Sequence, residues 1–380
     1  MRKIGLIAQG GAGWMGGSEY IRNLLRALAA ADASQPTLFC FGDDQDHWRD
    51  AGASLAPVRP MWHAPLVDRL GLNNRQFAAA LRRHPVEFLY PLTYGNRENI
   101  GLTFPLRRTL GDTRWAGWIP DFQHRHLPRF FTPAQAAHRD RGISALLAEA
   151  PAVVMSSGSA AEDLRAFYPG YRGRVKVLRF ATCPRPEWYE PFDAPELPER
   201  FFAVCNQFWL HKNHLTVFRA LALLAARGIR PVVLCTGALD EARDSSYPDQ
   251  VRSALHENGI ADHVRLLGLL PRRSQIEMLR RCVAVIQPSL FEGWSTVVED
   301  ARALGRPVLL SDIPVHREQA PPGARYFSAE SAEALAELLA DAWADWPAGP
   351  GLAAEQAARA AAEARLVEVG RRFLEIAAHP

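Results

Sequence analysis

One stretch in the last third of the chain limits the fold more than any other, because it has the pattern of a strand, a turn and a helix in succession. The apolar, β-branched run of residues 283–286 predicts a buried parallel strand, and a polar turn that contains glycine follows it. Thr296 and Glu299 have the T-x-x-E spacing of a capping box, and Gly305 followed by Pro307 predicts the helix end. A helix that starts directly after a buried strand points its free N–H groups over the sheet edge, so the sequence predicts an anion-binding site here.

Two carboxylates, Glu292 and Glu299, flank the predicted anion site, and two interpretations of them are open. In the first, Glu299 only caps its helix and Glu292 is solvated. In the second, both accept hydrogen bonds from hydroxyl groups, because an ionised carboxylate can accept such bonds but cannot bind an anion. Hydroxyl groups lie beside phosphate in nucleotides and sugar phosphates, so the second interpretation predicts a ligand of that kind.

Residues 288–305 resemble the signature of family 4 glycosyltransferases, retaining enzymes of the GT-B fold, in which E-G-F-G-x-x-x-x-E-A precedes A-x-G-x-P-V. The resemblance implies that Glu292 holds hydroxyls of a donor sugar, that Glu299 holds the nucleotide ribose, and that loop amides between them hold phosphate. The two glutamates are seven residues apart here, one fewer than in the family pattern. The donor-binding residues expected from the resemblance are Gly16, Gly17, Gln207, Lys212, Leu270, Ser289, Glu292, Gly293, Trp294, Ser295, Thr296 and Glu299.

A glycine-rich loop near the start of the chain also joins a predicted strand, residues 4–8, to a predicted helix. A loop of this kind suits a dinucleotide-binding fold equally well, but a strict G-x-G-x-x-G spacing is not present. The Gly16-Gly17-Ser18-Glu19 piece instead resembles the G-G-x-E with which many family 4 enzymes begin. In that family, this piece faces the donor phosphates and the acceptor.

Lys212 is one of only three lysines in a chain with 41 arginines, and it lies in a polar loop between a predicted strand and a predicted helix. It matches the position that grips the diphosphate in family 4, although Gln207 replaces the arginine usual five residues earlier. We therefore expect Lys212 and the helix N-terminus at Thr296 to stabilise the charge that grows on a departing diphosphate. Leu270 matches the place where the family contacts the base through its backbone.

Two further strand ends in the first half of the chain carry polar residues, at 93–97 and 120–126. Asp121 and His124 are close in sequence, and the Asp-Phe-Gln-His run is similar to the acceptor-side loop of a bacterial family 4 subgroup. The predicted catalytic residues are Lys212, Glu292, Asp121 and His124. The Asp44-Gln45-Asp46 triplet has the form of a metal-binding D-x-D, but it lies in a predicted polar turn, and no metal site is expected.

Strand-like and helical segments alternate along the whole chain, which predicts α/β architecture with parallel sheets. A proline-rich, aromatic stretch at 183–198 is interpreted as a linker. The prediction is therefore a GT-B fold with two Rossmann-like domains facing each other across a cleft. Its parts are an acceptor-side domain over 1–190, a nucleotide-sugar-binding domain over 198–350, and a C-terminal helix over 352–380 that returns to the first domain. The expected strands are 4–8, 37–41, 88–91, 115–119, 153–156, 201–205, 231–235, 264–267, 283–286 and 307–310.

Composition limits the class of protein further. The chain has 380 residues, of which 48% are hydrophobic and 22% charged, as in an ordinary globular protein of two domains. The five cysteines lack C-x-x-C spacing, so buried thiols are expected. Apolar runs are too short to span a membrane and the N-terminal run is too short for a signal peptide, so a cytoplasmic location is expected.

Charge is distributed unevenly between the two halves. Residues 1–195 carry 24 Lys and Arg against 18 Asp and Glu, a net +6, whereas 196–380 carry 20 against 23, a net −3. A basic half suits an acidic partner or an anionic membrane surface, which extends the expected location to the inner face of the plasma membrane. Without a recognisable nucleic-acid-binding motif, no nucleic acid partner is expected.

The resulting prediction is a metal-independent hexosyltransferase without a cofactor. It moves a sugar from a nucleotide-sugar donor to a glycan, lipid-linked or other acceptor in bacterial-type surface polysaccharide or glycoconjugate synthesis, with retention of configuration. The two alternatives are a nucleotide-sugar epimerase of the same fold and a non-catalytic sugar-nucleotide-binding module.

Overall fold

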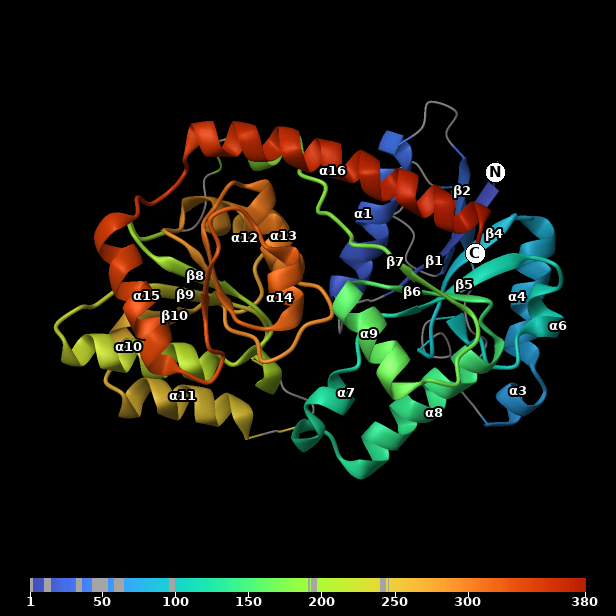
Figure 1. Ribbon diagram of the computed structural model, residues 1–380, viewed down its shortest axis with the longest axis horizontal. Helices are drawn as coiled ribbons and strands as arrows, with labels where there is room; N and C mark the ends of the chain where they lie inside the picture. Colours follow the sequence, from blue (N-terminus) through green and yellow to red (C-terminus); the bar gives the residue numbers. More distant parts are fainter. Residues whose placement is uncertain are drawn as a thin grey trace. The chain divides into compact units, whose positions relative to one another are not determined.

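The structure is a computed structural model that describes residues 3–9, 15–31, 36–42, 54–57, 65–95, 100–190, 192, 197–239, 244 and 246–380. The chain forms two compact units (Figure 1). The first unit contains Met1–His124, Thr132–Cys183 and Ala364–Pro380, and the second contains Arg125–Phe131 and Pro184–Glu363. Each unit therefore takes a segment from the sequence range of the other.

The first unit is built on a seven-stranded sheet in which every pair of neighbouring strands is parallel. The strand order is β3-β2-β1-β4-β5-β6-β7. The strands are β1 (Lys3–Ile7), β2 (Thr37–Gly42), β3 (Ser54–Pro57), β4 (Phe88–Leu92), β5 (Arg114–Ile119), β6 (Ala152–Met155) and β7 (Arg174–Val177). The helices of this half of the chain are α1 (Met15–Ala31), α3 (Pro65–Arg69), α4 (Leu72–Arg83), α6 (Arg107–Leu110), α7 (Gln123–His126), α8 (Pro133–Glu149) and α9 (Gly158–Phe167), with a short 3-10 turn, η1 (Pro128–Phe130).

The second unit repeats the plan with a six-stranded parallel sheet in the order β10-β9-β8-β11-β12-β13. The strands are β8 (Phe202–Cys205), β9 (Val233–Thr236), β10 (Val264–Leu266), β11 (Val285–Gln287), β12 (Val308–Ser311) and β13 (Arg325–Phe327). The helices are α10 (His214–Ala226), α11 (Tyr247–Glu257), α12 (Arg272–Arg281), α13 (Thr296–Ala303), α14 (Pro314–Gln319), α15 (Ala332–Asp345) and α16 (Leu352–Ala378), with 3-10 turns η2 (Pro186–Trp188), η3 (Leu210–Lys212) and η4 (Ala261–His263). The predicted α/β fold with two parallel-sheet units is confirmed.

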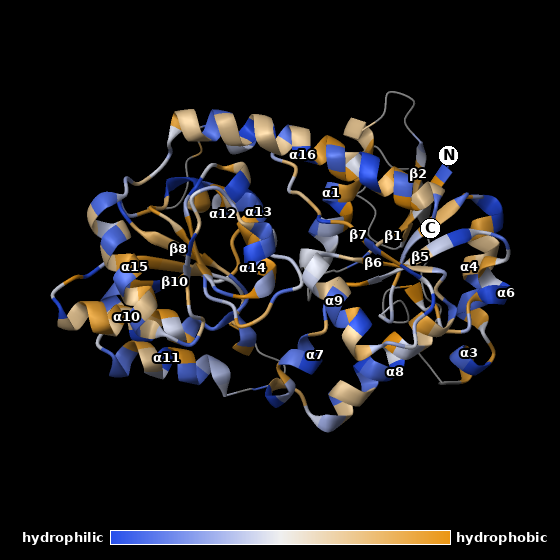
Figure 2. Ribbon diagram, in the orientation of Figure 1, coloured by the Kyte–Doolittle hydropathy of each residue, from blue (hydrophilic) through white to orange (hydrophobic). Residues whose placement is uncertain are grey.

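Burial explains why the ten expected strands were recognisable. The strands of both sheets are mostly apolar, whereas the helices alternate hydrophobic and hydrophilic residues (Figure 2). In α1, the predicted helical stripe of Ile21, Leu24, Leu25 and Leu28 is buried. The strands β3, β7 and β13 were not predicted.

The stretch predicted to be a linker is instead folded onto the second unit where the structure describes it. Trp188 is buried in the core formed by β8, β11, α12 and α13, and the Tyr189 hydroxyl donates to the backbone carbonyl of Ala303 at 2.8 Å. A proline-rich composition does not keep a segment solvated when it also supplies large aromatic side chains, because burying an aromatic ring stabilises by about 1.5–3 kcal/mol.

All five cysteines are free thiols, and Cys40, Cys205, Cys235 and Cys282 are buried, as expected, with Cys183 only partly so. Among the described residues, no helix has both the length and the apolar character needed to cross a bilayer.

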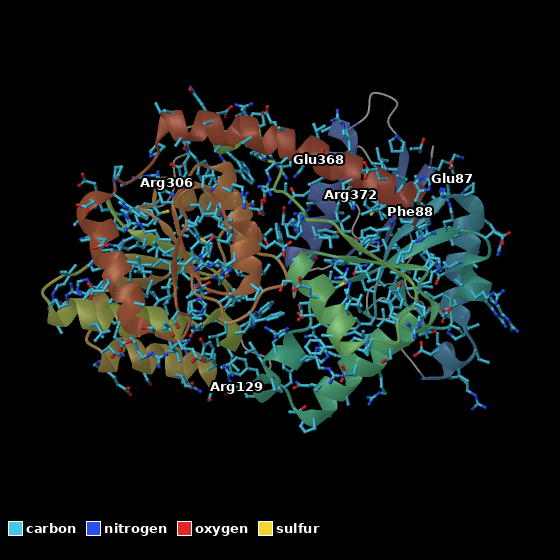
Figure 3. The ribbon with its side chains drawn as sticks, in the orientation of Figure 1. Glu87, Phe88, Arg129, Arg306, Glu368 and Arg372 are labelled. Atoms are coloured by element: carbon cyan, nitrogen blue, oxygen red, sulfur yellow. The ribbon has the colours of Figure 1, made fainter. Side chains whose placement is uncertain are left out.

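The C-terminal helix α16 belongs to the second unit over residues 352–363 and to the first over 364–378, so it returns to the first unit as predicted. In the first unit, the Phe373 ring contacts Phe88 and Tyr90 edge-on. Figure 3 labels Phe88 of β4 and Arg372 of α16. In the second unit, Glu355 accepts two hydrogen bonds from the Arg280 guanidinium of α12, at 2.6 and 3.1 Å, and both side chains are buried.

Replacing Glu355 by Ala tests this anchor. The Arg280 guanidinium would lose its bidentate partner while staying buried, so the free energy of unfolding should fall by about 3–5 kcal/mol. Glu363→Ala removes an exposed carboxylate from the same helix, which pairs with Arg359 on the surface, and should change stability little. Chemical denaturation of the three proteins measures the difference. Equal stability of the two variants would show that the Arg280 pair does not anchor the helix.

Candidate functional site

The strand order places two loops of the second unit side by side. The sheet has the strand order β10-β9-β8-β11-β12-β13. Successive strands are added on one side from β8 to β10 and on the other side from β11 to β13, so the order reverses between the neighbours β8 and β11. In open parallel sheets, ligands bind outside the carboxyl ends of the strands at such a reversal point. The loop after β8 contains Gln207 and Lys212, and the loop after β11 contains Ser289 and Glu292. The topology thus brings together these four residues of the predicted donor site.

Backbone and amide hydrogen bonds join the two loops. The Leu290 N–H donates to the His211 carbonyl at 2.8 Å. The Asn213 side-chain amide donates to the carbonyls of Pro288 at 3.0 Å and Ala329 at 2.8 Å. Asn213 has a φ of 58°, in the left-handed region where asparagine is tolerated better than most residues. One asparagine therefore turns the chain into α10 and ties three loops together.

Lys212 and Glu292 form an ion pair at the centre of this loop cluster. The Lys212 Nζ lies 2.5 Å from Glu292 Oε1, and the two side chains are only 13% and 8% exposed. The same oxygen accepts from Ser289 Oγ at 2.7 Å and from Gln287 Nε2 at 2.9 Å. A cation and a carboxylate that lie almost out of water at a sheet edge can bind an anion and hydroxyl groups, respectively.

A buried polar network that the sequence analysis missed supports this pair. Gln287, the last residue of β11, exchanges hydrogen bonds with the Asn206 amide at 2.9 and 3.3 Å. Ser311 Oγ donates to the Ser289 carbonyl at 2.6 Å, and the His316 ring contacts Ser311 through Nδ1. Burial lowers the pKa of His316, with the Glu292 carboxylate opposing the shift. The sequence contained one indication of this network, a glutamine directly after the apolar run 283–286.

The N-terminus of α13 differs from the prediction in one respect. The cap is Ser295, whose Oγ accepts from the Val298 N–H at 3.4 Å, and Thr296 is the first helical residue. The predicted Thr296–Glu299 capping box is therefore wrong: Ser295 has the extended backbone that a cap requires, one residue earlier. The predicted helix end is confirmed, since Gly305 has a φ of 62° and the Arg306 N–H donates to the Ala301 carbonyl at 2.9 Å.

Glu299 is buried beneath this helix start, and Glu292, which the first interpretation left solvated, is only 8% exposed. Its Oε1 accepts from Gln319 Nε2 at 3.1 Å and lies 3.8 Å from Arg302 Nη2. Gln319 also exchanges hydrogen bonds with the backbone of Ser295 at 3.0 and 3.2 Å. The glutamate and the cap of α13 are thus connected through one amide side chain.

The remaining predicted donor residues of the second unit lie on neighbouring loops. Gln207 accepts the Ala238 N–H at 2.6 Å, so it joins the loops after β8 and β9. Leu270 follows β10 and packs partly buried against the core, Gly293 is half-buried in the loop after β11, and Trp294 beside it is buried.

In the first unit, Gly16 and Gly17 lie in the first turn of α1. The adjacent Ser18 donates through Oγ to the Gln9 carbonyl at 3.1 Å, and Thr93 after β4 donates to the Gln9 side chain at 3.5 Å. β1 and β4 are the neighbours at which this sheet reverses, so its polar groups also gather at the reversal point. Residues 10–14 of the glycine-rich loop, the triplet 44–46 and residues 96–97 lie outside the described residues.

Asp121 follows β5 and His124 lies in α7, and each forms a hydrogen bond with a residue of α8. Asp121 accepts from Arg139 Nη2 at 2.7 Å, and His124 Nε2 lies 2.8 Å from Asp140 Oδ1. Burial alone would raise the pKa of Asp121, but the Arg139 charge and the Gln123 N–H outweigh it and hold that pKa below its usual value. Burial lowers the pKa of His124, which Asp140 partly opposes. An ionised Asp121 and a neutral His124 follow near neutral pH.

A pocket of about 410 Å³ opens beside the loop after β11 in the second unit. It is lined by Leu127, Arg129, Leu290, Asp312, Ser328, Ala329 and Glu330. Arg129, labelled in Figure 3, comes from the segment 125–131, which belongs to this unit. The ring of His126 in the same segment stacks on Phe291 with centroids 5.0 Å apart. The volume of the pocket suits a small-molecule ligand.

Two parallel-sheet units of this order, with a C-terminal helix that returns to the first, define the GT-B fold. The family model "Glycosyl transferases group 1" matches residues 190–366, which form nearly all of the second unit. The sequence of the second unit is thus similar to that of group 1 glycosyl transferases. A comparison with curated proteins finds no match.

Solved structures of low sequence identity have the same fold over the full chain. The sucrose-phosphate synthase of Thermosynechococcus elongatus is 17% identical, with a TM-score of 0.69 over 99% of this chain and 98% of that one. HepE of Anabaena, in complex with UDP and glucose, is 15% identical, with a TM-score of 0.70 over 99% of both chains. WaaG, a glycosyltransferase involved in lipopolysaccharide biosynthesis, is 13% identical, with a TM-score of 0.61 over 100% of both chains.

A second histidine of this loop cluster is also held neutral. His214 begins α10, is fully buried and stacks on the Phe208 ring with centroids 4.1 Å apart. Burial, with a further contribution from the Lys212 charge, lowers the pKa of His214 to about 3.

Because the folded state resists protonation of His214 and the unfolded state does not, stability should fall as the pH decreases below about 6.5. The contribution of this histidine is about 1.4 kcal/mol per pH unit, and His214→Gln should remove it. Denaturant unfolding between pH 6.5 and 5 measures the slope. His256→Gln, which changes an exposed histidine of α11, is the control. A His214→Gln slope equal to that of wild type would contradict the assignment of a neutral, buried imidazole.

Proposed function

We propose that the protein is a glycosyltransferase that moves a sugar from a nucleotide-sugar donor to a glycan, lipid-linked or other acceptor in bacterial-type surface polysaccharide or glycoconjugate synthesis. The observation that carries this proposal is the Lys212–Glu292 pair at the reversal point of the second sheet. An ammonium and a carboxylate 2.5 Å apart offer a nucleotide sugar one partner for its diphosphate and one for its sugar hydroxyls. UDP and UDP-glucose complexes of HepE support a donor of this class.

The proposed chemistry is electrostatic stabilisation of the leaving group. As the bond between the sugar and the diphosphate breaks, negative charge grows on the diphosphate oxygens, and Lys212 and the N-terminus of α13 would face that charge. These groups can do this without a metal ion, and we propose a metal-independent hexosyltransferase on that ground. Ser295 and Thr296 would present their N–H groups to phosphate, and Glu299 would hold the ribose. Retention of configuration follows in this proposal from the family 4 resemblance.

Asp121 and His124 are proposed to act on the acceptor side. Both side chains hold the loop after β5 against α8, through Arg139 and Asp140 respectively. Their contribution in this proposal is to fix the shape of that loop, with Gly16 and Gly17 at the start of α1 on the same unit. A rigid loop positions an acceptor hydroxyl better than a mobile one.

Lys212→Ala tests the leaving-group assignment. Turnover should fall at least 100-fold, on the order of the 2.7–4 kcal/mol lost when one preorganised stabilising group is removed, and Lys212→Arg should restore only part of it. Lys3→Ala, at an exposed position of the first unit, is the matched control. A thermal-shift screen of nucleotide sugars first identifies the donor, since a ligand at 100 times its dissociation constant stabilises by about 2.7 kcal/mol.

The outcomes separate the three classes of function. Sugar transfer by wild type and its loss in Lys212→Ala support the proposal. Isomerised sugar from the donor alone would favour an epimerase, and binding without turnover in the presence of glycan acceptors and membranes would favour a binding module. Normal turnover by Lys212→Ala would refute the assigned role of this loop.

We also propose a peripheral site on the inner face of an anionic membrane, through one face of the first unit. The helices α3, α4 and α6 pack in succession there, and Leu66 and Leu70 are 64% and 51% exposed. The described parts of residues 65–111 contain six arginines and two acidic residues, which gives a net charge of +4. The arginines are Arg69, Arg75, Arg82, Arg83, Arg107 and Arg108. Exposed leucines among arginines suit the boundary between lipid headgroups and acyl chains.

The double variant Leu66→Ser/Leu70→Ser should bind anionic vesicles less than wild type, because it removes the apolar contacts, and Arg82→Gln/Arg83→Gln should lose up to about 1 kcal/mol per arginine. Leu352→Ser changes an equally exposed leucine at the start of α16 and serves as the control. Vesicle sedimentation at low and high salt measures binding. If wild type stays in solution with anionic vesicles at low salt, the proposed membrane site is wrong and a soluble acceptor is favoured.

A further inference from the structure

Glu292 is held by more groups than a simple ion pair requires. Its Oε1 accepts from Lys212, Ser289 and Gln287, at 2.5, 2.7 and 2.9 Å. Ser289 and Gln287 are fully buried. Gln287 is fixed in turn by the Asn206 amide. The carboxylate is therefore positioned by rigid parts of the sheet edge, and Lys212 is its counter-ion.

The second oxygen of Glu292 differs from the first. Within the part of the chain that the structure describes, no donor hydrogen-bonds to Oε2. The Glu292 side chain is only 8% exposed, and its Oε2 is left as an acceptor for a hydroxyl donor. A sugar hydroxyl is a donor of this kind.

Binding of a diphosphate changes the charge balance at this place. A phosphate oxygen that approaches Lys212 either draws the ammonium away from Glu292 or shares it, and it brings negative charge beside the carboxylate. Like charges at short range repel, and removing one partner of a little-exposed pair leaves the other uncompensated. An intact nucleotide sugar offsets this cost, since its hydroxyls donate to Glu292. A nucleoside diphosphate lacks the sugar on its terminal phosphate that could do so.

We propose that Glu292 is a specificity-determining residue, whose pairing with Lys212 makes the site prefer an intact nucleotide sugar to the nucleoside diphosphate that the reaction releases. Specificity is a difference of affinities, and here it would come from a contact that penalises the product. The consequence is weak product inhibition and fast release of the diphosphate. This inference rests on the proposed function, because it assumes that Lys212 meets a diphosphate.

Titration calorimetry with UDP, GDP and ADP, each alone and as the glucose conjugate, tests the proposal on the full chain. Glu292→Gln keeps the size of the side chain and a hydrogen-bond acceptor but removes the charge. We expect it to bind the nucleoside diphosphate at least tenfold tighter than wild type and to shift the affinity ratio of nucleotide sugar to nucleoside diphosphate at least tenfold toward the latter.

Two further variants make the test specific. Glu337→Gln removes the same charge from an exposed pair with Arg227 in the same unit and should leave both affinities unchanged. In a Lys212→Ala background, Glu292→Gln should tighten diphosphate binding less than it does in wild type, because no ion pair remains to be broken. This double-mutant cycle distinguishes the effect of the Lys212–Glu292 ion pair from simple repulsion between the carboxylate and the diphosphate.

The results distinguish failure of this inference from failure of the proposed function. If Lys212→Ala weakens diphosphate binding but Glu292→Gln leaves it unchanged or weakens it, the selectivity proposal is wrong and the leaving-group role of Lys212 stands. If Lys212→Ala leaves the affinity for the diphosphate that wild type binds unchanged, or if wild type binds none of the three, the diphosphate assignment fails, and this inference fails with it.

Discussion

The pairing of β8 with β11 is the constraint on which the rest of the second unit depends. Val285 lies opposite Ala203 in parallel register, so two strands that are far apart in sequence end at the same edge of the sheet. Hydrophobic burial drives this pairing, since both strands consist of residues removed from water. The polar loops that follow these strands therefore lie side by side, and Lys212 contacts Glu292 for this reason.

Polar groups in such a place are costly unless every one of them is paired. Several groups here find partners across the loops: the Asn206 and Gln287 amides exchange hydrogen bonds, and Ser311 donates to the Ser289 carbonyl. Each bond is worth only about 1 kcal/mol net, but an unpaired amide would cost more. The network therefore contributes position rather than much stability. It fixes where the glutamate points, which is what a binding site needs from its surroundings.

Sequence patterns were sufficient to predict the elements that have a long apolar run or a clear periodicity. The apolar runs that form the two sheets, the helical stripe of α1 and the glycine that ends α13 all follow from local rules that tertiary context did not override. The cap of α13 could not be placed to the residue, because Ser295 and Thr296 both have a hydroxyl, and only the backbone angles distinguish the cap from the first helical position. Asp121 and His124 were interpreted as neighbours from their spacing, whereas their partners Arg139 and Asp140 lie on a helix that the pattern could not orient. Long-range partners are set by packing and leave no periodic trace in the sequence.

The division of α16 between the two units has a consequence for how the protein is made. A ribosome synthesises a chain from its N-terminus, and domains generally fold as they emerge. Residues 132–183 and the segments before them leave the ribosome early, but the first unit is completed only by Ala364–Pro380, which follow the whole of the second unit. Until then, the surfaces of Phe88 and Tyr90 that Phe373 covers are exposed. The half of the protein that is translated first is therefore completed only when the last helix has been made.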